Sequence, residues 1–200
     1  MKRFHSFQKI IGIIVLASCL SSCIPAALIV GATAGGAVIY DKRSVKTIAE
    51  DQESEKIAGH ALNQSDDLKT GTHIVIATFD HVLLLVGQTT TDEQRSTAYQ
   101  LVSSVKNIRR VYNEITIQKP TGEWQRSHDA WITTKIKTQL LATPGLHSTQ
   151  IKVLTEDSVV YLMGMLSHHQ ENLAINIARS TSGVNKVVKV FQSRSRSHNQ

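Results

Sequence analysis

The sequence predicts an α+β protein built from two tandem copies of one small module, each with the order helix, strand, strand, helix, strand. Three observations support this prediction. Residues 74–87 and 151–164 match without a gap at an offset of 77 residues. In both segments two apolar runs flank an acidic turn residue, Asp80 or Asp157, which is typical of a β-hairpin. Apolar residues at helical spacing then follow each hairpin.

A helix and a last strand are expected after each hairpin. The apolar face of that helix comprises Ala98, Leu101, Val102 and Val105 in the first copy, and Leu173, Ala174, Ile177 and Ala178 in the second. The last strands are expected at 111–117 and 187–191. A strand–helix–strand connection is right-handed and makes its two strands parallel, so each copy should form a three-stranded mixed sheet with helices on one face. A further helix precedes each hairpin and ends near Leu62 or Leu140.

The repeat also predicts how the chain is divided. We expect a signal peptide (1–22), a lipidated cysteine with an apolar tether (23–46), a first module (47–118), a linker (119–127), a second module (128–192) and a polar tail (193–200). Pro120 and Gly122 interrupt the pattern between the copies, and Trp124 falls in the linker, where the sequence assigns it no role. Modules of roughly 70 residues have small cores, so packing of the two modules against each other is expected.

The first 23 residues have the layout of a bacterial lipoprotein signal. A basic start precedes an apolar run at 10–17 that is well short of the ~20 residues of a membrane-spanning helix. The residues that end at Cys23 (LSSC) match the lipobox, whose cysteine carries the lipid, and those that end at Cys19 (LASC) match it as well. The fuller apolar and cleavage regions favour Cys23, and a signal cleaved without lipidation is the alternative.

Lipidation at Cys23 has consequences for chemistry and location. The mature chain then has no other cysteine, which excludes disulfides, thiol catalysis and cysteine-based metal sites. Ile24 follows the cysteine, where an aspartate would be the usual inner-membrane retention signal, and this favours the outer membrane. Residues 24–40 are rich in glycine and alanine and contain Pro25, so we interpret them as a tether along the bilayer, with a second membrane span as the alternative.

Composition and motifs argue against several functions. The formal charge of +6 falls to +3 once the three basic residues of the signal (Lys2, Arg3 and Lys9) are removed, which is too weak to indicate nucleic acid. The nine histidines include no pair at metal-binding helix spacing. No nucleophile elbow, P-loop or dinucleotide-binding glycine motif occurs. We therefore expect no enzyme activity, no metal and no cofactor.

The repeat resembles the BON domain, a bacterial module in which an apolar strand ends in glycine and a helix leads into a valine-rich last strand. Gly87 and Gly164 match the first feature, and GVNKV at 183–187 matches the second. The first copy has NIRRV at 107–111 and lacks that glycine. The chain also has, in this order, the lipobox, the Gly/Ala-rich tether and the segments DKRSV (41–45), VYNEI (111–115) and DAWITTK (129–135). This series resembles that of outer-membrane lipoproteins with two BON domains.

This resemblance implies a function as well as a fold. It implies a non-enzymatic lipoprotein on the periplasmic side of the outer membrane that binds anionic phospholipid, such as phosphatidylglycerol or cardiolipin, and supports envelope integrity. Division sites are a candidate location, and the outer-membrane assembly machinery is a candidate partner. The alternative is that both modules bind proteins and that the lipid anchor supplies all membrane contact.

The two modules differ in charge, and the difference points to a site. Residues 47–119 hold seven Lys and Arg against ten Asp and Glu, a net charge of −3, whereas residues 128–200 hold eight against four, a net charge of +4. Aligning Leu62 with Leu140 pairs Trp131 with Glu53, Lys135 with Ile57, and Lys137 with Gly59. Because an indole among lysines is typical of a lipid headgroup layer, Trp131, Lys135 and Lys137 are the predicted lipid-binding residues. The alternative is that Trp131 only covers the edge of the core. Supporting candidates are Lys152, Lys186 and Lys189.

Overall fold

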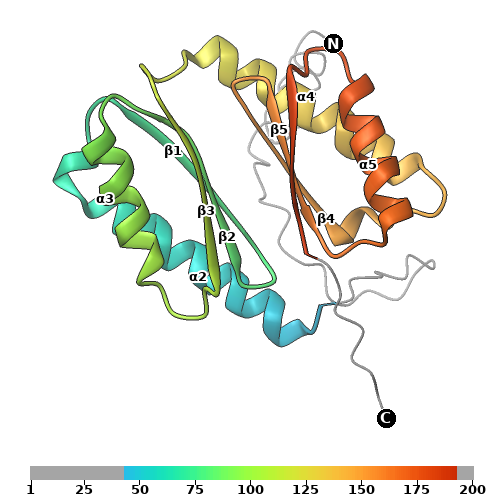
Figure 1. Ribbon diagram of the computed structural model, residues 1–200, viewed down its shortest axis with the longest axis horizontal. Coiled ribbons are helices and arrows are strands. Elements are labelled where there is room, and N and C mark those ends of the chain that lie inside the picture. The colour runs from blue at the N-terminus through green and yellow to red at the C-terminus, as the bar shows by residue number, and fades with distance from the viewer. Residues whose placement is uncertain (1–42, 193–200) are drawn as a thin grey trace, which may run out of the picture. The chain divides into compact units, whose positions relative to one another are not determined.

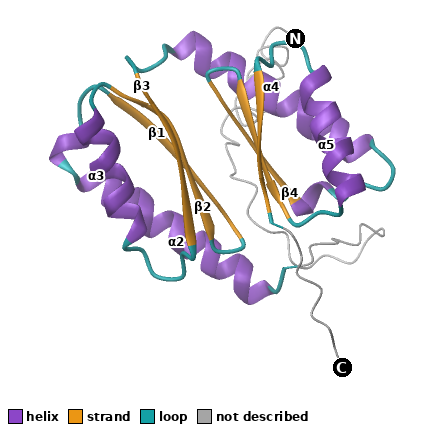
Figure 2. Cartoon of the chain, in the orientation of Figure 1, coloured by secondary structure: helices purple, strands orange, loops and turns teal. Residues whose placement is uncertain are grey.

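The computed structural model describes residues 43–192, which lie within one compact unit of the chain. In chain order the elements of the first module are α2 (Val45–Gln64), the 3-10 helix η2 (Asp66–Leu68), β1 (Thr72–Phe79), β2 (Val82–Thr89), α3 (Asp92–Ser103) and β3 (Arg110–Ile117). Those of the second module are α4 (Glu123–Ala142), the 3-10 helix η3 (Ser148–Gln150), β4 (Ile151–Glu156), β5 (Val159–Gly164), α5 (His168–Ser180) and β6 (Lys186–Phe191). The order helix, strand, strand, helix, strand thus occurs twice (Figures 1 and 2), and the α+β prediction is confirmed. Cys23, the signal peptide, most of the tether and the tail lie outside the described residues.

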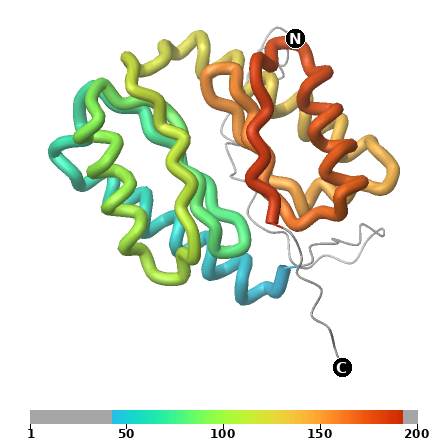
Figure 3. Tube along the Cα trace, viewed as in Figure 1, coloured from blue at the N-terminus to red at the C-terminus, as the bar shows by residue number. Residues whose placement is uncertain are grey.

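Each module contains the mixed sheet that the sequence predicts. In the first module β1 pairs antiparallel with β2, and β2 pairs parallel with β3. In the second, β4 pairs antiparallel with β5, and β5 pairs parallel with β6. The middle strand of each sheet is therefore β2 or β5, and the last strand returns beside it after the helix (Figure 3). In each module both long helices cover the same face of the sheet (Figure 1).

Two-residue turns close both hairpins. Asp80 and His81 have φ values of 47° and 62°, and Asp157 and Ser158 have φ values of 50° and 61°. Two consecutive left-handed residues make the mirror-image turn that matches the twist of antiparallel strands, and aspartate tolerates this conformation better than most residues. The predicted turns at Asp80 and Asp157 are confirmed.

The start of α4 differs from what the sequence pattern suggests. The helix begins at Glu123, inside the segment expected to be a linker, and Trp124 is its second residue. Gly122 takes an extended conformation, with φ −74° and ψ 169°, and provides no side-chain cap. Its carbonyl oxygen instead accepts a hydrogen bond from the backbone nitrogen of Arg126 at 3.2 Å. The break that Pro120 and Gly122 mark therefore stops at Gly122, where the helix can begin. The non-helical segment is shorter than the expected linker of 119–127.

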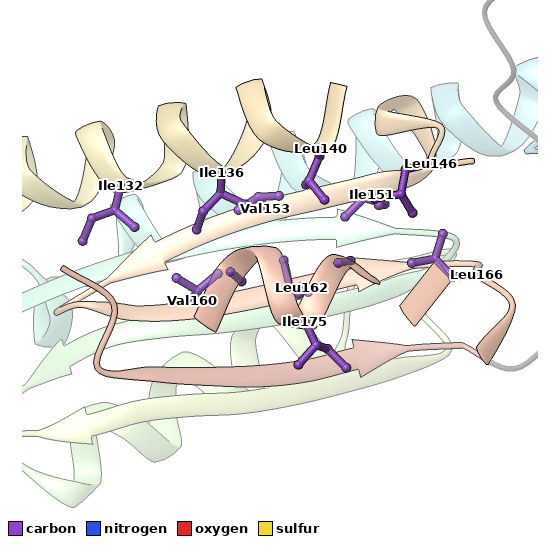
Figure 4. Packing of buried hydrophobic residues seen from close by; sticks show 12 residues of the cluster. Ile132, Ile136, Leu140, Leu146, Ile151, Val153, Val160, Leu162, Leu166 and Ile175 are labelled. Carbon is purple, nitrogen blue, oxygen red and sulfur yellow. The ribbon is translucent and has the colours of Figure 1, made fainter. Parts of the chain in front are cut away.

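The core of the second module lies between α4, α5 and the covered face of its sheet. Figure 4 shows Ile132, Ile136 and Leu140 extending from α4 toward Val153 on β4. The spacing of four residues places these three side chains on one stripe of the helix. All three are buried. The orientation of α4 is therefore fixed by this stripe, which determines which of its residues face outward.

The uncovered faces of the two sheets share one apolar cluster. Its buried members are Ala77, Phe79, Val82, Leu84 and Val86 of the first module and Tyr161, Met163 and Val190 of the second. A hydrogen bond adjoins it, in which Gln88 Nε2 donates to Glu156 Oε1 at 2.8 Å. Contact between the modules, which the small cores suggested, is therefore present within the described residues.

Gly87, two residues before the end of β2, and Gly164, the last residue of β5, are explained by close backbone approach. A Cβ atom on Gly87 would overlap the carbonyl oxygen of His73, and Gly87 has a φ of 117°. A Cβ atom on Gly164 would lie 2.5 Å from the carbonyl oxygen of Gln150. The backbone of β1 at Gly87, and the backbone of η3 at Gly164, thus occupies the space of a side chain.

Candidate lipid-binding site

The two first helices, α2 and α4, correspond residue by residue at an offset of 78. Both have 20 residues, and they begin at Val45 and Glu123. Asp51 accepts hydrogen bonds from both backbone amides of the first hairpin turn, at 2.7 and 2.8 Å. Asp129 accepts from both amides of the second turn, at 2.8 and 2.9 Å. The alignment that pairs Trp131 with Glu53 is therefore structural.

Trp131 lies on the outward side of α4, and its residue surface is 59% exposed. Its neighbour Ile132 is fully buried, because one residue turns the helix by about 100°. Lys135 follows one turn later, and its Nζ atom lies 5.8 Å from the centre of the Trp131 ring. This distance allows a cation–π interaction. The structure therefore brings Trp131 and Lys135 together on an accessible surface.

The turn between α5 and β6 packs beside this surface. Lys135 Nζ donates to the carbonyl oxygen of Ser182 at 2.6 Å. Gly183 has a φ of 97°, and a Cβ atom there would lie 2.9 Å from the His128 ring. Glycine is thus required at 183 by both the backbone conformation and the close packing. Lys186, an exposed residue, begins β6 three residues later.

Lys137 is exposed but lies on another side of α4. Two residues after Lys135, it is rotated about 200° around the helix axis from that lysine. It lines a cavity of about 550 Å³ together with Leu141 and Lys152. Of the three residues predicted to bind lipid, the structure places two side by side and the third apart.

Trp124 also faces outward from α4, and the sequence pattern did not single it out. It is 84% exposed. It precedes Trp131 by seven residues, which is two helical turns. The spacing of the two tryptophans was the available signal, but it has meaning only if Trp124 is helical, and Pro120 and Gly122 suggested a linker there.

Within α4, one carboxylate is exposed, that of Glu123 at the start of the helix. The carboxylates of α4 are Glu123 and Asp129, and Asp129 is buried beneath the hairpin turn. In α2 the position that corresponds to Trp131 is an exposed glutamate, Glu53. The charge difference between the modules is therefore present on the outward faces of these two helices.

Among residues 43–192, no cluster of three His, Cys, Asp or Glu side chains could hold a metal ion. None of the helices in that range has both the length and the apolar character needed to cross a membrane.

Comparison with known proteins identifies the module. The BON domain profile matches residues 50–119 and 128–194. The chain belongs to the BON domain family. Each match covers one of the two sheets and its helices, so the first and second modules are BON domains and the prediction from the repeat is confirmed.

Several known proteins align with much of the chain. It is 37% identical over 151 residues to the 21 kDa hemolysin of Actinobacillus pleuropneumoniae, covering 76% of this chain and 78% of that protein. It is 31% identical over 173 residues to the outer membrane lipoprotein DolP of Haemophilus influenzae, covering 86% of this chain and 89% of that protein. It is 29% identical over 130 residues to the osmotically-inducible protein Y of Escherichia coli K12, covering 64% of each chain.

Proposed function

We propose that this protein is a lipoprotein anchored to the outer membrane through Cys23, whose second BON domain binds anionic phospholipid on the periplasmic side. The observation that carries the proposal is the exposed indole of Trp131 with the ammonium group of Lys135 5.8 Å from its ring. Lys137 lies farther around α4 and adds to the general attraction of the domain for negative charge. By this contact the protein recognises the membrane surface and supports its integrity, including at division sites.

The chemistry of the site suits a headgroup layer. Indole rings are enriched where lipid headgroups meet acyl chains, because one part of the ring is apolar and its N–H can reach water. A cation near an anionic lipid surface contributes about 1 kcal/mol. The second BON domain has a net positive charge and the first a net negative charge. The second domain is therefore the one that such a surface attracts.

The anchor and the domain have different tasks in this proposal. Each buried methylene of an acyl chain contributes about 0.8 kcal/mol, so several chains on Cys23 hold the protein on the membrane. The domain contact then sets which lipid the protein recognises and how it is oriented. The names of two relatives, an outer membrane lipoprotein and a hemolysin, support a membrane setting.

Vesicle flotation tests the proposal. The chain used is residues 24–200 without acyl groups, which keeps every described helix and strand. It is expected to float with vesicles that contain phosphatidylglycerol or cardiolipin and to stay behind with phosphatidylcholine alone. Trp131→Glu should abolish flotation. Tyr99→Glu is the matched control, because Tyr99 is an aromatic residue of the first BON domain with 43% exposure.

Two outcomes would contradict the proposal. Equal flotation of the Trp131→Glu variant would remove Trp131 from the site. The second outcome combines two results. Residues 24–200 without substitution do not float, and the acylated protein crosslinks to an envelope protein such as a component of the assembly machinery. This outcome would favour protein recognition by both domains.

A further inference from the structure

Trp124 and Trp131 lie on one face of α4. Seven residues turn a helix by about 700°, so the two side chains leave the axis within about 20° of each other and about 10 Å apart along it. We infer that Trp124 is a second membrane-contacting residue and that α4 lies lengthwise on the headgroup layer of an anionic bilayer. This inference rests on the proposed function and adds a second anchor and an orientation to it.

Trp124 is the most exposed large hydrophobic residue in the part of the chain that the structure describes. At 84% it is more exposed than Trp131, at 59%. Indole rings are large and apolar and are usually largely buried in folded proteins. An indole this accessible contributes little to the core, so its effect on folding and its effect on binding can be measured separately.

The surface that joins the two indoles is suited to a flat, negatively charged partner. Ser127 is exposed between them, and His128 is half-buried against the turn at Gly183. Lys135 continues the line by one more turn beyond Trp131. The row Trp124, Trp131 and Lys135 therefore presents two apolar rings and one cation without an intervening carboxylate.

The proposed partner is a bilayer because of where the chain is attached. Twenty residues lead from Cys23 to Lys42, and they span at most about 70 Å when fully extended. With the anchor in place, a lipid surface is always within this reach. A helix that lies in the interface buries its apolar face about 5–10 Å into the headgroup boundary, and two indoles on one face enter to a similar depth only when the helix lies flat.

The first BON domain offers an internal comparison. The offset of 78 residues places Lys46 where α4 has Trp124, and Glu53 where it has Trp131. The corresponding face of α2 thus has no indole and carries a carboxylate at its centre. Lengthwise docking is specific to α4.

Fluorine NMR tests the inference directly, because the chain contains two tryptophans in total. Residues 24–200 are labelled with 5-fluorotryptophan, and the two signals are assigned with Trp124→Phe and Trp131→Phe. Bicelles containing phosphatidylglycerol and a headgroup spin-labelled lipid are then added. Broadening of both signals is expected, and it should be absent with phosphatidylcholine bicelles.

The other outcomes separate this inference from the proposed function. Broadening of the Trp131 signal alone would overturn lengthwise docking and leave the proposed function standing. Broadening of neither signal would overturn both. Broadening of the Trp124 signal alone would overturn both the role of Trp131 and the shared face.

A binding measurement gives independent support. Trp124→Ala is expected to lower the partition coefficient into phosphatidylglycerol vesicles roughly tenfold, because an indole that leaves water loses a large apolar area. Tyr99→Ala is the control and should leave partition unchanged. Circular dichroism should show the same helix content for both variants. An unchanged partition coefficient for Trp124→Ala would contradict the inference.

Discussion

The Nζ atom of Lys135 lies 5.8 Å from the centre of the Trp131 ring and also donates to the carbonyl oxygen of Ser182. The cation is thus held beside the indole by the turn that precedes β6. Lys135→Gln is expected to weaken binding to phosphatidylglycerol vesicles about fivefold, because one well-placed cation contributes about 1 kcal/mol. Titration of the chain with vesicles at constant ionic strength measures this change.

Lys137→Gln is the matched control for that prediction. It removes the same charge from the same helix but on a side rotated about 200° from Lys135. A smaller loss is expected, and it should disappear first as salt is added, because charges that do not touch the surface are screened. Equal losses for the two variants would show that total charge alone governs binding.

A second prediction concerns the carboxylate beneath each hairpin. Asp129 accepts from both amides of the turn at Asp157 and Ser158 and from Gln125 Nε2 at 3.0 Å. Asp129→Ala is expected to lower the free energy of unfolding by about 2–4 kcal/mol, because it leaves turn amides without a charged acceptor. Urea unfolding followed by circular dichroism measures the change. Asp51→Ala, its counterpart in the first domain, should give a loss of similar size, and a negligible loss in both would contradict the proposed support.

The glycines give a third prediction, with opposite signs at two sites. Gly87→Ala should destabilise the protein by about 3 kcal/mol or more, because the new methyl group meets the His73 carbonyl and the residue has a positive φ. Gly59→Ala is expected to stabilise it by about 0.5–1 kcal/mol, since Gly59 lies inside α2 and a Cβ atom there makes only an ordinary contact, 3.8 Å from Ile76. Thermal or urea unfolding distinguishes the two. If Gly87→Ala left the free energy of unfolding unchanged, close approach of the neighbouring strand would be excluded as the reason why position 87 is glycine.

A fourth prediction follows from the carboxyl group of Glu156. The residue is 6% exposed, and burial raises the pKa of this group, while the hydrogen bond from Gln88 and the charge of His73 act against the rise. The folded state therefore holds the proton more tightly than the unfolded state. Its contribution to stability is fully present below the unfolded pKa and is lost as pH rises through the folded value.

Glu156→Gln tests this pH dependence, since a glutamine can still accept the hydrogen bond from Gln88. The variant should have the higher free energy of unfolding, and its advantage over the parent protein should be largest at pH 7. It should shrink as the pH is lowered toward 4.5. A difference that stays constant over this range would mean that the carboxyl group titrates alike in both states.

The parts of the fold that depend on local pattern were predictable from the sequence. The hairpin turns at Asp80 and Asp157 were expected because turn residues between two apolar strands act locally. The stripe of Ile132 to Leu140 follows from helical spacing. Contacts between distant segments were not predictable in the same way. Asp129 reads as an ordinary charged residue on a helix, and nothing nearby in the sequence reveals that it holds a turn 28 residues away.

The candidate site likewise has a part that was predictable from local pattern and a part that was not. Trp131 and Lys135 are four residues apart, so their adjacency could be read from helical geometry. The same geometry separates Lys137 from them, a point that the charge count alone concealed. Trp124 was missed because the start of a helix depends on the backbone of the capping residue, and Gly122 can adopt either a linker or a capping conformation.

Because α2 and α4 have the same length, the outward-facing residues of one helix can be transferred to the corresponding positions of the other. The carboxylate that supports the hairpin lies on the inner side of both helices, so outer residues can be exchanged without disturbing it. Writing the α4 row onto α2, as Lys46→Trp, Glu53→Trp and Ile57→Lys, would yield a bivalent molecule from one chain. The avidity of this variant for vesicles would then show whether α2 and α4 can bind one bilayer at the same time.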